Sequence, residues 1–156
     1  MPTSDAPAIA PIVVTAEIAA PPAQCYERFT AGFGDWWPVR THSLSRNAAT
    51  RCVLEARVGG RVFEITPDAT EHLWGNVTAV EPGRAVRFTW HPGREAGSAQ
   101  WVEIRFETVP AGCRATLTHA GWESLGEIAP LLRQEYASGW CQVFGELFAG
   151  YAAVRN

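Results

Sequence analysis

Two titratable side chains stand out on segments predicted to be strands. His119 shares the parity of Ala115 and Leu117, so it is expected to face the core of a sheet. Glu64 lies on the predicted strand 61–66, where parity alone does not decide its face. An inward imidazole can shuttle a proton or hydrogen-bond a ligand carbonyl. A carboxylate in an apolar cavity is expected to have a raised pKa, and can act as an acid or base or bind a ligand hydroxyl or amine.

Each of these two residues also has a structural explanation. A strand Glu is often paired with an Arg or exposed on the outer face, and a core His is more often bonded to a backbone carbonyl. As an acid-base pair, Glu64 and His119 would suit enolisation or dehydration. The distance between them cannot be read from the sequence, so both interpretations stay open.

The last quarter of the chain, residues 130–154, is the element that must position these groups. Its apolar residues recur at steps of three and four, which puts them on one face of a helix. Pro130 suits a first helical position because it has no amide to leave unpaired. These apolar residues are Leu132, Tyr136, Trp140, Val143, Phe144, Leu147, Phe148 and Tyr151. So broad an aromatic face predicts a large partner surface.

The segments before this helix read as strands joined by turn signals. Gly59-Gly60, Pro82-Gly83 and Pro110-Ala111-Gly112 each lie between two strand-like segments. A short helix opened by Pro21 and Pro22 follows the first strand, and a turn of helix with a loop is expected in 35–43. The order predicts an α+β domain with an antiparallel seven-stranded meander. The predicted strands are 12–18, 52–58, 61–66, 71–80, 84–90, 99–109 and 114–120.

Composition limits the classes of function. A chain of 156 residues suits one domain, expected over 11–156 after a flexible tail at 1–10. No apolar run reaches the ~20 residues of a membrane span, and no signal-peptide pattern is present, so a cytoplasmic protein is expected. A net charge of -3, with Arg as the only basic residue besides His, argues against nucleic acid. Four scattered Cys predict reduced, mostly buried thiols, and no metal or cofactor motif is found.

Several short motifs, in order, resemble one superfamily. They are Ala20-Pro21-Pro22, Trp36-Trp37-Pro38, the stretch 58–64, Trp74-Gly75-Asn76-Val77 before Glu81-Pro82-Gly83, Trp90, the stretch 117–122, and 136–140. The chain resembles START-like, helix-grip (SRPBCC, birch-pollen-allergen-like) domains, in the branch of heat-shock protein 90 ATPase activator homologues. The resemblance implies a curved seven-stranded sheet gripping the carboxy-terminal helix, with a deep apolar cavity between them. It also implies that Val62 and Glu64 face inward.

The resemblance further implies that the segment after the first helix lies near the cavity entrance. There Arg40 could meet an anionic group of a ligand while Trp36 and Trp37 contact its apolar body, or the Trp pair could plug the opening. Trp101 is expected on the outer face with Phe63, where an apolar surface would favour a homodimer. The expected ligand-binding set is Trp36, Trp37, Arg40, His42, Val62, Glu64, Trp74, Phe88, Trp90, Val102, His119, Trp122, Trp140 and Phe144.

The leading functional hypothesis is binding of a hydrophobic or aromatic small molecule, lipid-like or polyketide-like, without a cofactor. Two alternatives follow from the same resemblance. One is a cyclase or aromatase-like acid-base enzyme that uses Glu64 and His119. The other is a co-chaperone-like module that stimulates a chaperone ATPase. Fold alone does not choose among them.

Overall fold

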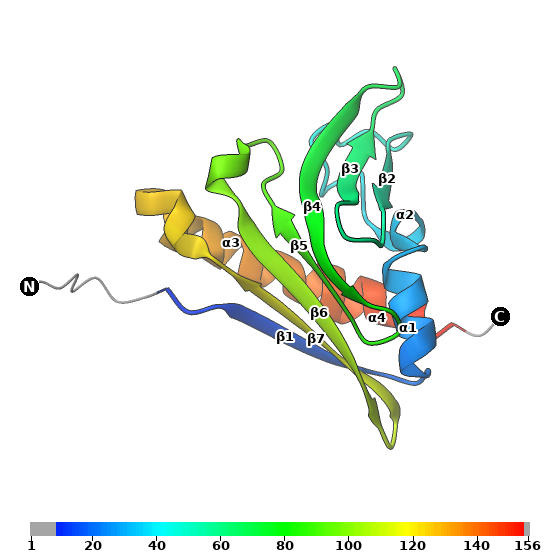
Figure 1. Ribbon diagram of the computed structural model, residues 1–156. Helices are drawn as coiled ribbons and strands as arrows, with labels where there is room; N and C mark the ends of the chain where they lie inside the picture. Colours follow the sequence, from blue (N-terminus) through cyan, green and yellow to red (C-terminus); the bar gives the residue numbers. More distant parts are fainter. Residues whose placement is uncertain (1–8, 155–156) are drawn as a thin grey trace, which may run out of the picture.

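The protein is a curved antiparallel sheet with one long helix across its concave face. The computed structural model describes residues 9–154. The strands are β1 (Ile12–Ile18), β2 (Arg51–Leu54), β3 (Arg61–Ile65), β4 (Glu71–Glu81), β5 (Ala85–Trp90), β6 (Gln100–Val109) and β7 (Gly112–Ala120). Their order in the sheet is β1-β7-β6-β5-β4-β3-β2, so the first strand pairs with the last (Figure 1). The predicted α+β helix-grip fold is confirmed.

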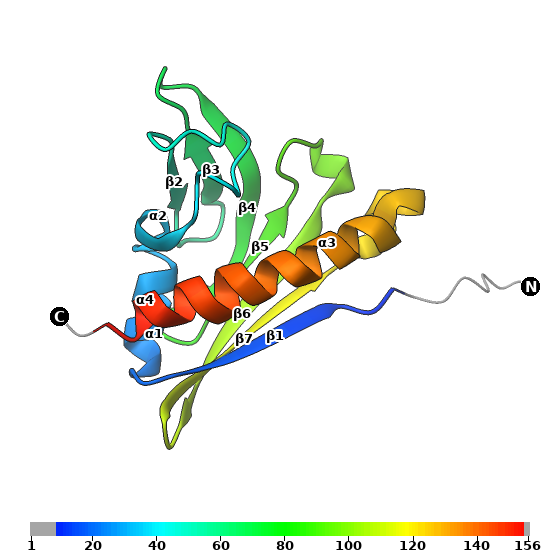
Figure 2. The same cartoon turned by 180° about the vertical axis from the view of Figure 1, so that it is seen from behind.

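The long carboxy-terminal helix consists of α3 (Ala129–Gln142), a π-helical turn η3 (Val143–Phe148) and α4 (Ala149–Ala152). Figure 2 shows it crossing the sheet. The predicted helix 130–154 is therefore confirmed, except for its ends and the π turn. Trp140, Phe144 and Phe148 are buried on the side that faces the sheet. An extra residue per turn widens a helix locally, and such turns are common at functional sites.

Two short helices follow β1, as predicted. The first, α1, spans Pro22–Phe29 and buries Cys25, Tyr26 and Phe29. The second, α2, spans Phe33–Trp36, so it begins two residues before the predicted segment 35–43. Ring contacts explain the early start, because Phe33 packs against Phe29 and Trp36 with centroid separations of 5.8 and 5.4 Å.

Irregular pairing bends the sheet near its β2 edge. The register between β3 and β4 shifts between Val62 and Phe63, and the register between β4 and β5 shifts between Val77 and Ala79. Such bulges increase the local twist and turn a strand. At Gly75 the β4 backbone comes so close to β5 that a Cβ atom would overlap the carbonyl oxygen of Thr89. Only glycine fits this bend.

Two segments differ from the sequence-based prediction. The strand expected over 52–58 ends at Leu54, because the next residues form a compact turn in which Arg57 and Gly60 donate to the carbonyls of Glu55 and Arg57. The segment before the long helix is a 3-10 helix, η2 (Trp122–Ile128), rather than an open linker. A second 3-10 helix, η1 (Ala96–Ser98), precedes β6.

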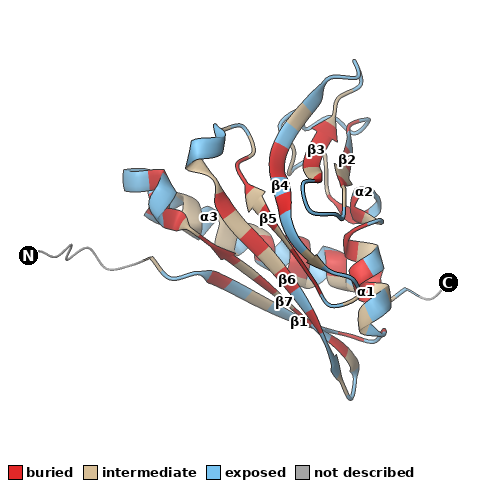
Figure 3. Cartoon of the chain, in the orientation of Figure 1, coloured by how far each residue is buried: buried red, intermediate tan, exposed pale blue. Residues whose placement is uncertain are grey.

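Aromatic rings fill most of the space between sheet and helix. Buried residues alternate with more exposed ones along the central strands (Figure 3). Phe29 contacts Phe88, Phe144 and Phe148 with centroid separations of 6.4, 6.3 and 5.3 Å. Rings at such distances gain dispersion and quadrupole energy and leave no room for a ligand. The inner half of the expected deep cavity is therefore solid core.

Arginines cover the aromatic residues of the outer face. Phe63 is only 4% exposed, and the Arg61 guanidinium lies 4.1 Å from its ring centroid. Trp101 faces outward as predicted, with the Arg87 guanidinium 3.8 Å from its ring. The expected bare apolar surface is therefore wrong, because cation-π contacts cover both rings. The expected homodimer loses the observation on which it rested and stays an untested prediction.

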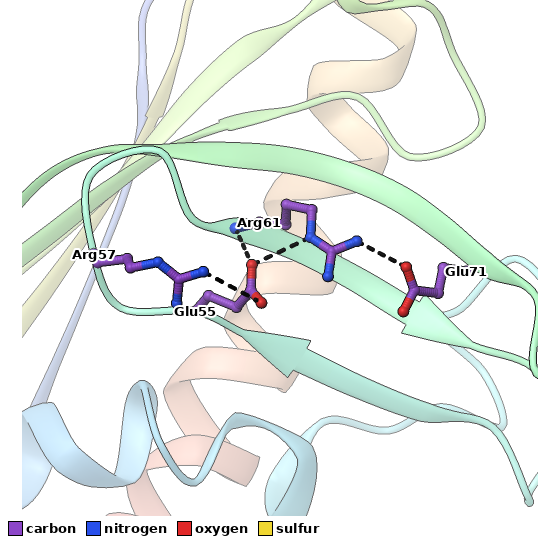
Figure 4. Close-up of polar contacts among 4 residues, drawn as sticks. All are labelled: Glu55, Arg57, Arg61 and Glu71. Atoms are coloured by element: carbon purple, nitrogen blue, oxygen red, sulfur yellow. Dashed lines mark hydrogen bonds and ion pairs between the residues drawn. The ribbon is translucent and has the colours of Figure 1, made fainter.

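Arg61 is held over Phe63 by two carboxylates. Its Nε and Nη1 atoms lie 3.2 and 2.8 Å from carboxylate oxygens of Glu55 and Glu71, and Arg57 also pairs with Glu55 (Figure 4). These pairs are exposed, so they contribute little to stability. Their effect is to fix the guanidinium in place.

No helix among residues 9–154 is long and apolar enough to cross a membrane. The predicted tail 1–10 lies almost wholly outside the described residues.

Candidate functional site

His119 is a fully buried histidine whose two ring nitrogens both have partners. The indole nitrogen of Trp140 donates to Nδ1 over 2.9 Å. Because Nδ1 accepts, the ring proton is on Nε2, which donates to Oε1 of Gln100 over 3.4 Å. Arg94 donates to the same oxygen over 3.2 Å. The ring therefore joins β7 to β6 and to the long helix.

Burial keeps His119 neutral. Loss of solvent, together with the nearby positive charge of Arg94, lowers its pKa from 6.5 to about 3. A neutral imidazole with both nitrogens bonded has no lone pair or proton available for a ligand. The ring has a structural role, but its partners are two side chains rather than the backbone carbonyl of the alternative considered from the sequence.

Glu64 faces inward on β3, as the resemblance implied, and is fully buried. Its Oε1 accepts from the Leu44 amide over 2.7 Å and from the Trp74 indole nitrogen over 2.9 Å, and its Oε2 accepts from the Ser45 amide over 3.1 Å. Burial alone would raise the pKa of Glu64, but the donors outweigh it and the pKa is lowered. The expected raised pKa is therefore wrong. Glu64 is an ionised anchor for the loop at 44–45.

Indole rings separate Glu64 from His119. Trp74 is bonded to Glu64 and Trp140 to His119, and Trp90 lies between them at centroid separations of 5.7 and 5.6 Å. No hydrogen bond joins the two titratable groups in the part of the chain that the structure describes. A shared catalytic role stays a prediction, and the hydrogen bonding does not favour it.

The open part of the cavity lies at one end of the helix-sheet interface and has a volume of about 390 Å³. Residues of α3 from Leu132 to Trp140 form one side, and the loop between α2 and β2 forms the other. Four indole rings provide its apolar walls. The lining residues are Trp37, Thr41, His42, Ser43, Leu44, Arg46, Trp74, Trp90, Pro92, Leu132, Glu135, Tyr136, Gly139, Trp140 and Val143.

Five residues of the expected ligand-binding set line this pocket: Trp37, His42, Trp74, Trp90 and Trp140. The other nine do not. Arg40 is exposed, and Trp36 belongs to the solid core, where its ring lies 5.0 Å from that of Phe148. The remaining seven are buried away from the opening, namely Val62, Glu64, Phe88, Val102, His119, Trp122 and Phe144.

Sequence reasoning missed the loop residues Thr41, Ser43, Leu44 and Arg46 and most of the α3 face, including Gly139. The loop residues have no helical or strand periodicity, so no pattern pointed to them. Leu132, Tyr136 and Val143 could have been found, because with Trp140 they follow one another at steps of three and four along the predicted apolar face. Glu135 and Gly139 lie five residues and one residue before Trp140, so this spacing does not point to them.

Hydrogen bonds hold the loop at the mouth of the pocket. The Trp37 indole nitrogen donates to the His42 carbonyl over 2.7 Å, and Ser43 Oγ donates to the Val39 carbonyl over 2.6 Å. Farther along the loop, the backbone amides of Leu44 and Ser45 donate hydrogen bonds to the Glu64 carboxylate. One wall of the pocket is therefore fastened to the sheet through a single buried carboxylate.

His42 is a titratable group on the pocket wall. Its Nδ1 lies 2.7 Å from the Thr41 hydroxyl oxygen. Its Nε2 faces the backbone of α3, where a Cβ added to Gly139 would lie 3.9 Å from it. Partial burial, and then the charge of Arg46, lowers the pKa of His42 below 6.5, so the ring is neutral at pH 7. No hydrogen bond to Nε2 is found within residues 9–154.

Comparison with solved structures gives proteins of the same fold. A Chromobacterium violaceum protein matches with 20% identity and a TM-score of 0.65, over 94% of this chain and 100% of that one. A Bacillus halodurans protein matches with 18% identity and a TM-score of 0.66, over 94% and 99%. A protein described as an anthrahydroquino-gamma-pyrone synthase matches with 26% identity and a TM-score of 0.59, over 93% and 96%.

Two further comparisons concern the sequence itself. A search of curated proteins found no match. The family model described as activator of Hsp90 ATPase homolog 1-like protein matches residues 19–152, which is most of the chain and includes every element that lines the pocket. The chain therefore belongs to the family of activator of Hsp90 ATPase homolog 1-like proteins.

Proposed function

We propose that the protein binds a planar, mainly apolar small molecule in the pocket between α3 and the loop at 37–46. The observation that carries this proposal is the wall of four indole rings, Trp37, Trp74, Trp90 and Trp140, around a space of about 390 Å³. Pockets of this size with apolar walls and a few polar groups are typical of small-molecule sites. Flat aromatic walls favour flat ligands, because stacked rings maximise contact area.

The relative described as an anthrahydroquino-gamma-pyrone synthase supports the same class of ligand. Its name denotes a fused-ring aromatic product, and it matches nearly the full length of this chain. By that analogy, the expected ligand is a fused-ring or polyketide-like aromatic rather than a long acyl chain. The shape of the pocket supports this expectation, because the core rings of Phe29, Phe144 and Phe148 close its inner end, where an acyl chain would need to extend.

Native mass spectrometry of freshly purified protein, compared with its denatured mass, tests the proposal. We expect a reproducible excess mass of small-molecule size that is absent from Gly139→Leu, whose side chain would extend into the pocket from α3. Gly150→Leu is the matched control, because a Cβ at that position meets nothing within 4 Å. No excess mass, together with no thermal shift across a panel of fused-ring aromatics, would reject the proposal.

A further inference from the structure

The polar groups of the pocket are few and unequally placed. Arg46 and Glu135 are exposed at its mouth, whereas His42 is partly buried on its wall. A buried polar atom that faces a ligand contributes more to selectivity than an exposed one, because water does not compete for it. Such atoms on this wall include Nε2 of His42 and the indole nitrogen of Trp90, which is buried without a hydrogen-bond partner among residues 9–154. The Trp90 nitrogen can only donate, so discrimination in favour of a ligand that donates a hydrogen bond depends on His42.

The contacts of Thr41 favour one of the two neutral forms of the His42 ring. The Thr41 hydroxyl lies 3.4 Å from the Pro38 carbonyl oxygen, to which it can only donate, and 2.7 Å from His42 Nδ1. A hydroxyl has one proton, so both contacts are satisfied together only if Thr41 donates to Pro38 and accepts from Nδ1. Nδ1 then carries the ring proton, and Nε2 presents a lone pair.

That lone pair faces the pocket. Nε2 lies opposite Gly139, the one position of this α3 face without a side chain, and an ideal Cβ there would stand 3.9 Å away. The missing side chain leaves a gap beside an acceptor atom, bounded by the Trp140 ring on the next position of α3. A ligand that fills this gap must present a hydrogen-bond donor to Nε2, since an acceptor would be repelled.

We propose that the pocket selects planar aromatic or enolic ligands that carry a free hydroxyl, and that His42 Nε2 accepts the hydrogen bond from this hydroxyl. This inference rests on the proposed function, because it names the ligand class of the same pocket. His42 is the recognition residue, and Thr41 positions it.

Calorimetric titration with two probes of nearly equal size tests the inference. 2-Naphthol donates a hydrogen bond, and 2-methoxynaphthalene has the same rings without the donor. One neutral hydrogen bond predicts that wild-type protein binds 2-naphthol about 5- to 10-fold more tightly. In His42→Phe, which keeps a ring but removes the acceptor, we expect this ratio to fall to about 1, with 2-methoxynaphthalene affinity preserved.

The variant Gly139→Leu, which should block the pocket, and its control Gly150→Leu distinguish a failure of this inference from a failure of the proposed function. If Gly139→Leu abolishes binding of both probes, Gly150→Leu does not, and His42→Phe leaves the ratio unchanged, the pocket is real and the inference is wrong. If neither probe binds, or Gly139→Leu has no effect, the proposed function fails and the inference fails with it.

A pH titration of wild-type protein gives a second test that does not depend on folding of a variant. Protonation of His42 fills the Nε2 lone pair, so discrimination between the probes should persist at pH 7 and disappear as the pH falls below 6.5. The other titratable or charged groups around the ring are Arg46 on its own loop and Glu135 and Tyr136 on α3. A ratio that stays constant while the His42 ring protonates, as followed by the chemical shifts of its ring nuclei, would overturn the inference.

Discussion

The Trp140 indole joins the pocket to the interior of the sheet, because its ring lines the opening while its nitrogen donates to Nδ1 of the buried His119. The wall residue is therefore fixed by a hydrogen bond to β7 and not by packing alone. A rigid wall lowers the entropy cost of binding.

Removing the charge of Glu64 should loosen the loop over the pocket. Glu64→Gln replaces one carboxylate oxygen with an amide nitrogen that cannot accept from the amides of Leu44 or Ser45. We expect a loss of about 1.5–3 kcal/mol in the free energy of unfolding and faster hydrogen exchange at these two amides. Glu55→Gln, on the outer face, is the control. Unchanged exchange at both amides would show that Glu64 does not hold the loop.

The same carboxylate predicts a dependence of stability on pH. The pKa of Glu64 is lower in the folded protein than its usual 4.5, because its hydrogen-bond donors outweigh burial. As the pH falls below 4.5 the unfolded state binds the proton first, so this part of the stability decreases with acidification. Denaturation curves of Glu64→Gln should therefore depend less on pH below 4.5 than those of wild type. Parallel curves would contradict the ionised state.

His119 acts over a pH range that extends higher than that of Glu64. Its pKa is about 3 in the folded protein and 6.5 when unfolded, so between these values the unfolded state binds one more proton. Stability should fall by about 1.4 kcal/mol for each pH unit within that range. His119→Gln keeps an acceptor for the Trp140 nitrogen and should flatten this slope. A wild-type slope equal to that of the variant between pH 6 and 5 would show that His119 is not held neutral.

Substitutions at two glycines of the long helix should distinguish an effect on stability from an effect on ligand binding. An alanine at Gly150 meets nothing within 4 Å, and an alanine at Gly139 makes only an ordinary contact with His42. Each should raise the free energy of unfolding by about 1 kcal/mol through helix propensity. Only Gly139→Ala should also weaken 2-naphthol binding. Equal binding by the two variants would place the ligand elsewhere.

The sequence predicted the fold well, for reasons that particular residues illustrate. Alternation at Val102, Ile104 and Phe106 gave the inward face of β6, and steps of three and four gave the long helix. The loop at 37–46 could not be predicted, because its conformation depends on acceptors distant in sequence, such as Glu64. The lowered pKa of Glu64 was missed for the same reason, since its backbone donors come from that loop.

The sequence also did not reveal how the side chains pack. The resemblance turned Val62 and Glu64 inward and so placed Phe63 on the outer face, but it does not reveal that Arg61 covers the ring. The resemblance implied a deep cavity, whereas the rings around Phe29 fill its inner half. Whether a cavity is open depends on the volumes and rotamers of many side chains together.

The most direct test of the central claim is nuclear magnetic resonance of the seven indole N–H groups during titration with 2-naphthol. Ring currents from a bound aromatic shift nearby nuclei, so the signals of Trp37, Trp74, Trp90 and Trp140 should move together with one dissociation constant. Those of Trp36, Trp101 and Trp122 should stay fixed. Shifts confined to these last three signals, or no shift at all, would contradict the claim that the pocket beside α3 binds planar aromatic ligands.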